Sequence, residues 1–305
     1  MSDNRDAALF LALAAVWGSA FVATKAALAA IPPVLLAALR FDVVALLLFV
    51  AALATGRRLR PRGRGDWLPI LTGGAFSIGA HHALLFSGQQ YVTSAVASTL
   101  LGSIPVLTPV ATHLLRTDQR PGATTVAGLL AGFAGVVLIA DPDPDALLAG
   151  ATGTLLVFGA AVAFVLGAVS TDERRATLSP FALQAWMALV GAGLLHAAAL
   201  GLPGESLAAA TWTPTAVGWL LYLAVVPGAA GFFTYFRLLD RLGPLQVGLL
   251  EYAIPPFAAA FGWLVLREPL APSTVAGFAT ILVGFLLVKS GAIVRALERY
   301  RHQPG

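Results

Sequence analysis

The sequence predicts an all-α membrane protein with ten transmembrane helices, arranged as two inverted five-helix repeats. The first observation is composition: 58% of the residues are apolar and 11% are charged, against about 25% charged in soluble domains. The second is an internal duplication, in which residues 92–138 resemble residues 242–287. The third is the placement of the 19 Lys and Arg residues, which gather on one side of the predicted membrane.

Ten stretches are apolar enough to cross the hydrocarbon of a bilayer, which takes about 20 residues. We expect them at residues 7–29, 33–54, 67–87, 94–115, 122–140, 150–170, 180–201, 213–236, 244–265 and 272–290. A secretory signal is the competing interpretation of the first stretch. Ser2–Asp6 carries two acidic residues against one Arg, however, and the apolar run is too long. We therefore expect a permanent first helix.

The basic residues predict the orientation of these helices. With the N-terminus in the cytoplasm, 16 of the 19 Lys and Arg residues fall in cytoplasmic segments, and only Arg267 falls in an opposite loop. This asymmetry follows the positive-inside rule, so both termini are expected in the cytoplasm. It also accounts for the pI of 9.8 without nucleic acid as a partner. The absence of cysteine excludes disulfides and thiolate metal sites.

The duplication predicts how the helices are related. Thr125-Val126-Ala127-Gly128 precedes Gly135, and the same tetrapeptide at 274–277 precedes Gly284. Five helices per repeat is an odd number, so the second repeat enters the membrane from the opposite face. Inverted repeats are typical of secondary transporters, whose substrate site lies between the repeats. The expected division is a first repeat, an acidic outer linker, a second repeat and a basic cytoplasmic tail, at residues 1–140, 141–149, 150–290 and 291–305.

Glycine and proline patterns add two structural expectations. Gly128 and Gly132 form a GxxxG face, which favours close helix packing within one protomer or between protomers. Prolines in the fourth and ninth helices either shape a cavity through kinks or simply accommodate packing. They are Pro105, Pro109, Pro255 and Pro256.

Several local patterns resemble one family. Trp17-Gly18-Ser19-Ala20-Phe21, Leu39-Arg40-Phe41 and Leu266-Arg267-Glu268-Pro269-Leu270 are similar to recurring stretches of the EamA family in the drug/metabolite transporter superfamily. The resemblance covers nearly the whole chain as two units. It departs from the family at Phe164, where many relatives have Trp, and at Asp118-Gln119, where a Glu is expected. It implies a ten-helix inverted-repeat transporter, often an exporter of amino acids or other small metabolites.

Ionisable residues within the bilayer cost about 2.5 to 3.5 kcal/mol each on insertion scales, so each needs a partner, water or a function. Arg40 is the strongest candidate for substrate binding, because its charged guanidinium fork can hold a substrate carboxylate with two hydrogen bonds. A purely structural ion pair is the alternative. Asp42 lies two residues away on a different helix face and is not the obvious partner.

An aromatic stripe marks the first helix. Trp17, Phe21 and Lys25 recur every four residues, which predicts a cavity wall with a cation at its outer rim, suited to an amphipathic solute. Helix packing explains the aromatic residues equally well, and Lys25 can extend to the outer surface instead. Tyr235 and Tyr252 are further candidates for the cavity wall, with ordinary packing as the alternative.

Three residues are candidates for handling protons or polar substrate groups. His81 and His82 lie in the middle of the third helix about 100° apart, so one at most is expected to face a central cavity. We assign His82 to substrate binding and His81 to proton coupling. The alternative is that both are neutral histidines that form hydrogen bonds within the bundle. Glu251 is the other candidate for proton coupling. The alternative is that it is a structural partner of Arg40 or of a hydroxyl group. No metal-binding motif and no cofactor are expected.

The sequence therefore predicts a multi-pass protein of the cell membrane with a central cavity formed by helices 1 to 4 and their inverted counterparts. Its expected function is alternating-access transport, and by resemblance export, of a small organic metabolite such as an amino acid or amphipathic drug. A membrane-embedded enzyme and a non-transporting sensor or assembly protein are the rival functions. The expected partners are the solute, the bilayer and, as an option, a second copy in a homodimer.

Overall fold

The computed structural model is helical throughout the residues it describes, which are 2–116, 123–140, 147–170 and 176–301. Seven helical stretches are long and apolar enough to cross a bilayer, and three shorter apolar helices lie at Val126–Ile139, Leu250–Leu266 and Pro272–Leu287 within the described ranges. These ten stretches match the ten expected spans in order. The all-α fold with ten apolar helices is therefore confirmed.

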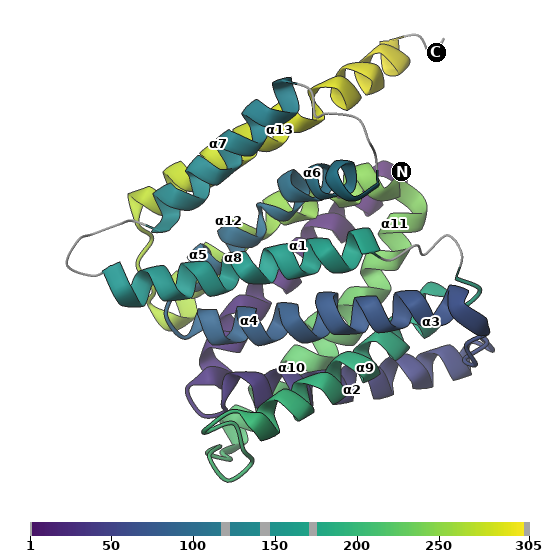
Figure 1. Ribbon diagram of the computed structural model, residues 1–305, viewed down its shortest axis with the longest axis vertical. Coiled ribbons are helices and arrows are strands. Elements are labelled where there is room, and N and C mark those ends of the chain that lie inside the picture. The colour runs from purple at the N-terminus through teal and green to yellow at the C-terminus, as the bar shows by residue number, and fades with distance from the viewer. Residues whose placement is uncertain (1, 117–122, 141–146, 171–175, 302–305) are drawn as a thin grey trace.

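The first half holds five spans (Figure 1). The first two are α1 (Ser2–Leu28) and α2 (Pro33–Ala54). The third is continuous through α3 (Gly63–Thr72), the π-helix η1 (Gly73–Ala80) and α4 (His81–Gln89). The fourth is broken into α5 (Ser94–Leu101) and α6 (Ile104–Arg116), and the fifth is α7 (Ala123–Ala140).

The second half follows the same plan. Its first two spans are α8 (Leu147–Ser170) and α9 (Pro180–Gly201). The next is α10 (Pro214–Leu223), the π-helix η3 (Ala224–Ala230) and α11 (Gly231–Val247). The last two are α12 (Leu250–Phe261) with the π-helix η4 (Gly262–Leu266), and α13 (Pro272–Arg301). The acidic residues of the linker, 141–145, lie outside the described ranges, as do Asp118 and Gln119.

Local chemistry sets several helix boundaries. Side-chain oxygens of Thr93, Ser179 and Thr213 accept from the backbone N–H of the third residue of α5, α9 and α10, respectively, as N-cap residues do. The ninth span begins at Leu250 rather than at residue 244 as expected. The chain turns at Gly243, whose φ of 79° is open to glycine but strained for other residues, and residues 244–247 form a separate short helical segment before α12 begins.

The contacts between helices have two-fold symmetry. α2 packs along α9, and α7 packs along α13, so these two pairs join equivalent helices of the two halves. α1 contacts α12, and its equivalent α8 contacts α5 and α6. Likewise, α1 contacts α10 and α11, whereas α8 contacts η1 and α4. The π-helices η1 and η3 occupy equivalent spans, so the duplication extends to an irregular feature of the backbone.

Glycines bring α7 and α13 into close contact, and the two helices lie side by side (Figure 1). A Cβ on Gly135 would lie 2.7 Å from the Gly277 carbonyl oxygen, and the reverse distance is also 2.7 Å. A Cβ on Gly284 would lie 2.6 Å from the Gly128 carbonyl oxygen. The GxxxG face therefore packs within the protomer, with Gly128 and Gly132 both at this interface.

The bundle has two ends, which we name by a buried carboxylate at each. The Asp66 end carries the loop 55–62, and α1 begins and α13 ends toward it (Figure 1). The Glu268 end carries the connections around residues 30, 92, 205 and 268. The charge distribution predicts that the Asp66 end faces the cytoplasm, and this orientation stays a prediction.

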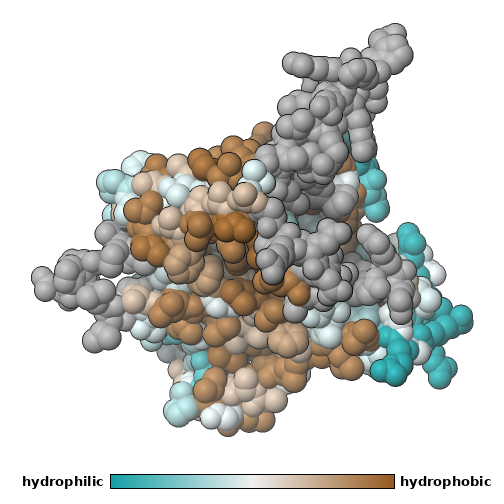
Figure 2. Space-filling model, turned by 45° about the horizontal axis from the view of Figure 1, so that its top comes forward, coloured by the Kyte–Doolittle hydropathy of each residue, from teal (hydrophilic) through white to brown (hydrophobic). Residues whose placement is uncertain are grey.

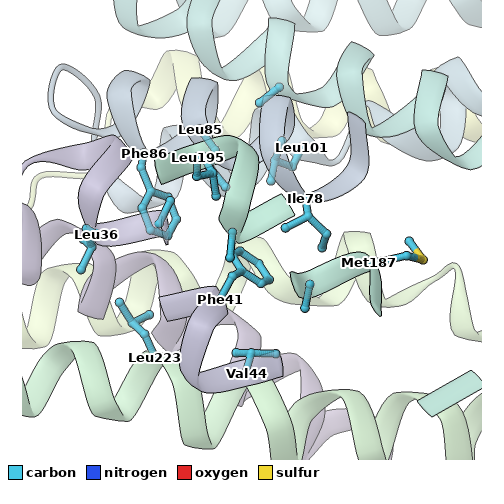
Figure 3. Close-up of a cluster of buried hydrophobic side chains, with 14 of the residues drawn as sticks. Leu36, Phe41, Val44, Ile78, Leu85, Phe86, Leu101, Met187, Leu195 and Leu223 are labelled. Carbon is cyan, nitrogen blue, oxygen red and sulfur yellow. The ribbon is translucent and has the colours of Figure 1, made fainter. Parts of the chain in front are cut away.

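Large apolar side chains are exposed along the bundle, including Leu53 at 64%, Leu155 at 69% and Leu200 at 91%. Figure 2 shows hydrophobic residues across the middle of the visible face and hydrophilic ones toward its sides. Such an apolar surface suits contact with lipid. Inside, Phe41 of α2 lies among apolar side chains from both halves, including Ile78 and Leu223 (Figure 3).

Candidate functional site

A cavity of about 600 Å³ lies between the two halves. Its wall is formed by α1, α2, η1, α4, α5 and α6 from the first half and by α8, α9, η3, α11, α12 and α13 from the second. Spans 1 to 4 and their equivalents were expected to form it, and all of them contribute. A volume of this size holds a small organic molecule.

The cavity is closed at the Glu268 end and open toward the Asp66 end. At the closed end, the wall residues Thr24 and Gln89 are 2% and 0% exposed. The Gln89 amide also donates to the Phe21 carbonyl oxygen at 3.1 Å and ties α4 to α1. Toward the other end the wall includes Ala176 and Leu239, which are half-buried, and Pro180, which is exposed.

Trp17 anchors an aromatic wall. Its indole N–H donates to the Pro227 carbonyl oxygen at 3.1 Å, and the π-helix η3 supplies this oxygen because Pro227 lies within it. The Trp17 ring lies 5.5 Å from the Tyr235 ring and 6.4 Å from the Phe232 ring. Trp17, Phe21 and Tyr235 all line the cavity, as expected, so α1 and α11 share an apolar wall.

Arg40 lines the cavity from α2 with only 9% of its surface exposed. Its guanidinium carbon lies 5.2 Å from the Phe41 ring centre and 5.8 Å from the Phe86 ring centre. The buried Nε has no hydrogen-bond partner among the described residues. Asp42 is indeed not its partner, because Asp42 pairs with His196 at 2.8 Å on the exposed side of α2 and α9.

His81 and His82 both line the cavity, although one at most was expected to do so. The Nδ1–H of His81 donates to the Ala160 carbonyl oxygen at 2.8 Å, and that of His82 donates to the Ile78 carbonyl oxygen at 3.1 Å. The π-helix η1 ends at residue 80, and its wider turn precedes the pair. In a neutral imidazole this leaves Nε2 as a hydrogen-bond acceptor.

Glu251 lines the cavity from the first turn of α12. No ion pair or hydrogen bond joins its carboxyl group to another described residue. Glu251 is therefore not the structural partner of Arg40 that the sequence left open. The two opposite charges share one cavity without pairing, which leaves each available to a solute or a proton.

Two expected site residues lie elsewhere. The Lys25 ammonium donates to the Val92 carbonyl oxygen at the Glu268 end, and Lys25 does not line the cavity. Tyr252 is 8% exposed and packs its ring 4.7 Å from the Phe285 ring. It follows Glu251 by about 100° around the helix, so its side chain points from the cavity toward α13.

Several wall residues were not identified from the sequence. They include Phe86, Gln89, Phe164, Phe232 and Gln184. Gln89 could have been found, because a glutamine in an apolar span needs a hydrogen-bond partner. In the described part of the chain, no three His, Cys, Asp or Glu residues lie together where they could hold a metal ion.

A carboxylate accepts backbone hydrogen bonds near the start of a helix at each end of the bundle. Asp66 is 0% exposed and accepts from the backbone N–H groups of Thr177 and Leu178 at 2.6 and 3.2 Å, just before α9. Glu268 accepts from the Ser94 N–H at 2.9 Å at the start of α5. A carboxylate at a helix N-terminus also interacts favourably with the helix dipole.

Comparison with known proteins places this geometry in a family. The sequence profile of the EamA-like transporter family matches residues 6–140 and again residues 151–290. The chain is similar to the uncharacterized transporter YvbV of Bacillus subtilis, at 29% identity over 95% of this chain and 93% of that protein. It is also similar to a probable amino-acid metabolite efflux pump of Salmonella typhimurium, at 27% identity over 97% and 99%.

A solved crystal structure supports the fold. It aligns with a TM-score of 0.63 over 93% of this chain and 97% of that chain, at 22% identity. At this identity the likeness concerns the fold alone. The profile match extends over both halves, and the cavity lies between them. The chain therefore belongs to the EamA-like transporter family.

Proposed function

We propose that this transporter is a secondary carrier that exports small amphipathic metabolites, amino acids among them, by alternating access. The cavity between the two halves carries the proposal, because its wall is mainly apolar and aromatic and yet contains Arg40 and Glu251. Such a wall suits a solute with an apolar body and a polar head. The relative named as a probable amino-acid metabolite efflux pump supports this class of solute and the direction.

The position of the opening is the one from which an export cycle starts. With the Asp66 end in the cytoplasm, as the basic residues predict, the open cavity would load solute from inside the cell. The Glu268 end would then face outward and open in the second conformation. Location in the cell membrane and cytoplasmic termini are part of this proposal.

Within the cavity we assign substrate contact to Trp17, Phe21, Arg40, His82 and Tyr235, and proton coupling to Glu251 and His81. We leave Lys25 and Tyr252 out of the set because neither lines the cavity. A second copy of the chain is not needed to complete the site. Dimerisation therefore stays an expectation of the sequence.

The test is solute flux in proteoliposomes, with a panel of amino acids and small aromatic amphiphiles. We expect saturable flux of at least one solute class and none in liposomes without the protein. Trp17→Ala should weaken the apparent affinity by roughly 10-fold, or about 1.4 kcal/mol, because it removes an aromatic surface from the cavity wall. Absence of saturable flux for the whole panel would overturn the proposal and favour a non-transporting sensor.

A further inference from the structure

Arg40 is a buried cation that forms no ion pair with any described residue. Two described carboxylates already pair with other arginines. Asp6 pairs with Arg241 at 3.0 Å, and Asp66 pairs with Arg58 at 3.4 Å. No described carboxylate lies within ion-pair distance of Arg40. An unpaired charge within a membrane span is costly. A protein can keep such a charge where a ligand supplies the opposite one.

Arg40 is oriented so that its guanidinium can meet a negatively charged group inside the cavity. Its Nε is enclosed, and Phe41 and Phe86 flank the guanidinium carbon at 5.2 and 5.8 Å. The two rings leave the terminal nitrogens as the part of the fork that can reach a ligand from the cavity side. Two parallel N–H groups match the two oxygens of a carboxylate.

The other groups around Arg40 do not compete for that role. His81 and His82 each donate Nδ1–H to a backbone carbonyl, so neither supplies a negative charge. Glu251 is the single carboxylate among the wall residues, and it belongs to the first turn of α12. The Arg40 side of the cavity is therefore positive, while the Trp17 side is apolar and aromatic.

We infer that the transported solutes carry a carboxylate that binds the Arg40 fork, with an apolar body against the wall around Trp17. This inference rests on the proposed transport function and narrows its substrate class. Neutral amphiphiles and amines without a carboxylate are poor substrates, because they leave the guanidinium unpaired. Organic acids without an amino group are substrates alongside amino acids, because the carboxylate alone satisfies Arg40.

One set of indole compounds with different charges tests this. Purified protein in proteoliposomes is assayed for counterflow with indole-3-propionate, its amide, tryptophan and tryptamine. The two carboxylates should be transported, and the amide and tryptamine should show an apparent affinity weaker by at least about tenfold, as expected for loss of a charged hydrogen bond. This comparison uses the wild-type protein and does not depend on how a variant folds.

Variants then assign the effect to Arg40. Arg40→Gln should abolish the preference for propionate over its amide, and Arg40→Lys should retain part of it, since the charge stays and the fork is lost. Lys25→Gln is the matched control, because it removes another cation of a membrane span, one that does not line the cavity. Size-exclusion profiles and thermal melting report whether each variant is folded.

The outcomes separate the two proposals. Saturable flux of the amide or of tryptamine, equal to that of the carboxylates, would overturn this inference and leave the transport function standing. An Arg40→Gln protein that is folded and keeps the carboxylate preference within twofold would overturn it as well. Flux of none of the four compounds and none of the wider panel would refute the transport function, and the inference with it.

Discussion

Replacing Glu268 should open the closed end of the cavity. The Glu268 carboxylate accepts from the Ser94 N–H at 2.9 Å, beside the Lys25 ammonium that donates to the Val92 carbonyl oxygen. Ser94 is fully buried, so Glu268→Ala leaves its N–H without a partner while this end is closed. When the end opens, water can bond the same N–H. The cost of the lost acceptor therefore falls on the closed conformation alone.

That cost sets the size of the effect. A buried donor left unsatisfied costs about 1–3 kcal/mol, which corresponds to a shift of about 5- to 150-fold in the conformational equilibrium. Glu268→Gln keeps an acceptor oxygen and loses the charge, so its effect should be smaller. Gly262 allows the carboxylate to approach, since a Cβ there would lie 2.5 Å from the Glu268 oxygen.

Accessibility of a single cysteine measures the shift. The chain has no cysteine, so Thr24→Cys in the cavity wall can be labelled by a membrane-impermeant maleimide without background. We expect the labelling rate from the Glu268 side to rise about 5- to 150-fold in Glu268→Ala. Glu205→Ala is the matched control, because Glu205 also accepts one backbone N–H at 2.9 Å, from Leu35, but joins α2 to the loop after α9. An unchanged rate in Glu268→Ala, or an equal rise in Glu205→Ala, would refute the reasoning.

Three further predictions concern packing, capping and coupling. Gly135→Ala should lower the stability by about 1–3 kcal/mol through overpacking of α7 on α13, measured as a fall in melting temperature, whereas Gly193→Ala, with nothing within 4 Å, should not. Asp66→Ala should cost about 1–3 kcal/mol, because it leaves the buried N–H of Leu178 unpaired; a melting temperature equal to wild type would exclude this. Glu251→Gln should transport without responding to an imposed pH gradient, and a wild-type response would exclude Glu251 as the coupling site.

Hydropathy predicted the apolar helices well because it acts locally. A run of apolar residues must be helical in the bilayer, since no water is present to satisfy its backbone. The family resemblance, from patterns such as Trp17-Gly18 and Glu268-Pro269, was confirmed by the profile match to both halves. Because that family consists of transporters, the membrane-embedded enzyme considered from the sequence is wrong.

The cavity wall was harder to predict, because it depends on helix rotation and on irregular turns. Lys25 shares a helical stripe with Trp17 and Phe21 but lies one turn too far along α1, where the chain at Val92 covers it. His81 and His82 both line the cavity from the first turn of α4, because the cavity borders more than one face of that helix, which the assumption of a single cavity-facing side did not anticipate. The caps by Asp66 and Glu268 join residues 111 and 174 positions apart, and no local pattern signals such pairings.

The two halves are equivalent in topology but unequal in how firmly they are held, and this inequality indicates where motion occurs. Asp66 of the first half caps α9, and its counterpart Glu205 of the second half caps α2. Asp66 receives five hydrogen bonds, whereas one is present at Glu205. Together with the long packing of α2 on α9, these caps favour movement of the pair as one body. The closed end must then open by separation of η4 from α5, which breaks the Glu268–Ser94 contact and spares the Glu205 contact.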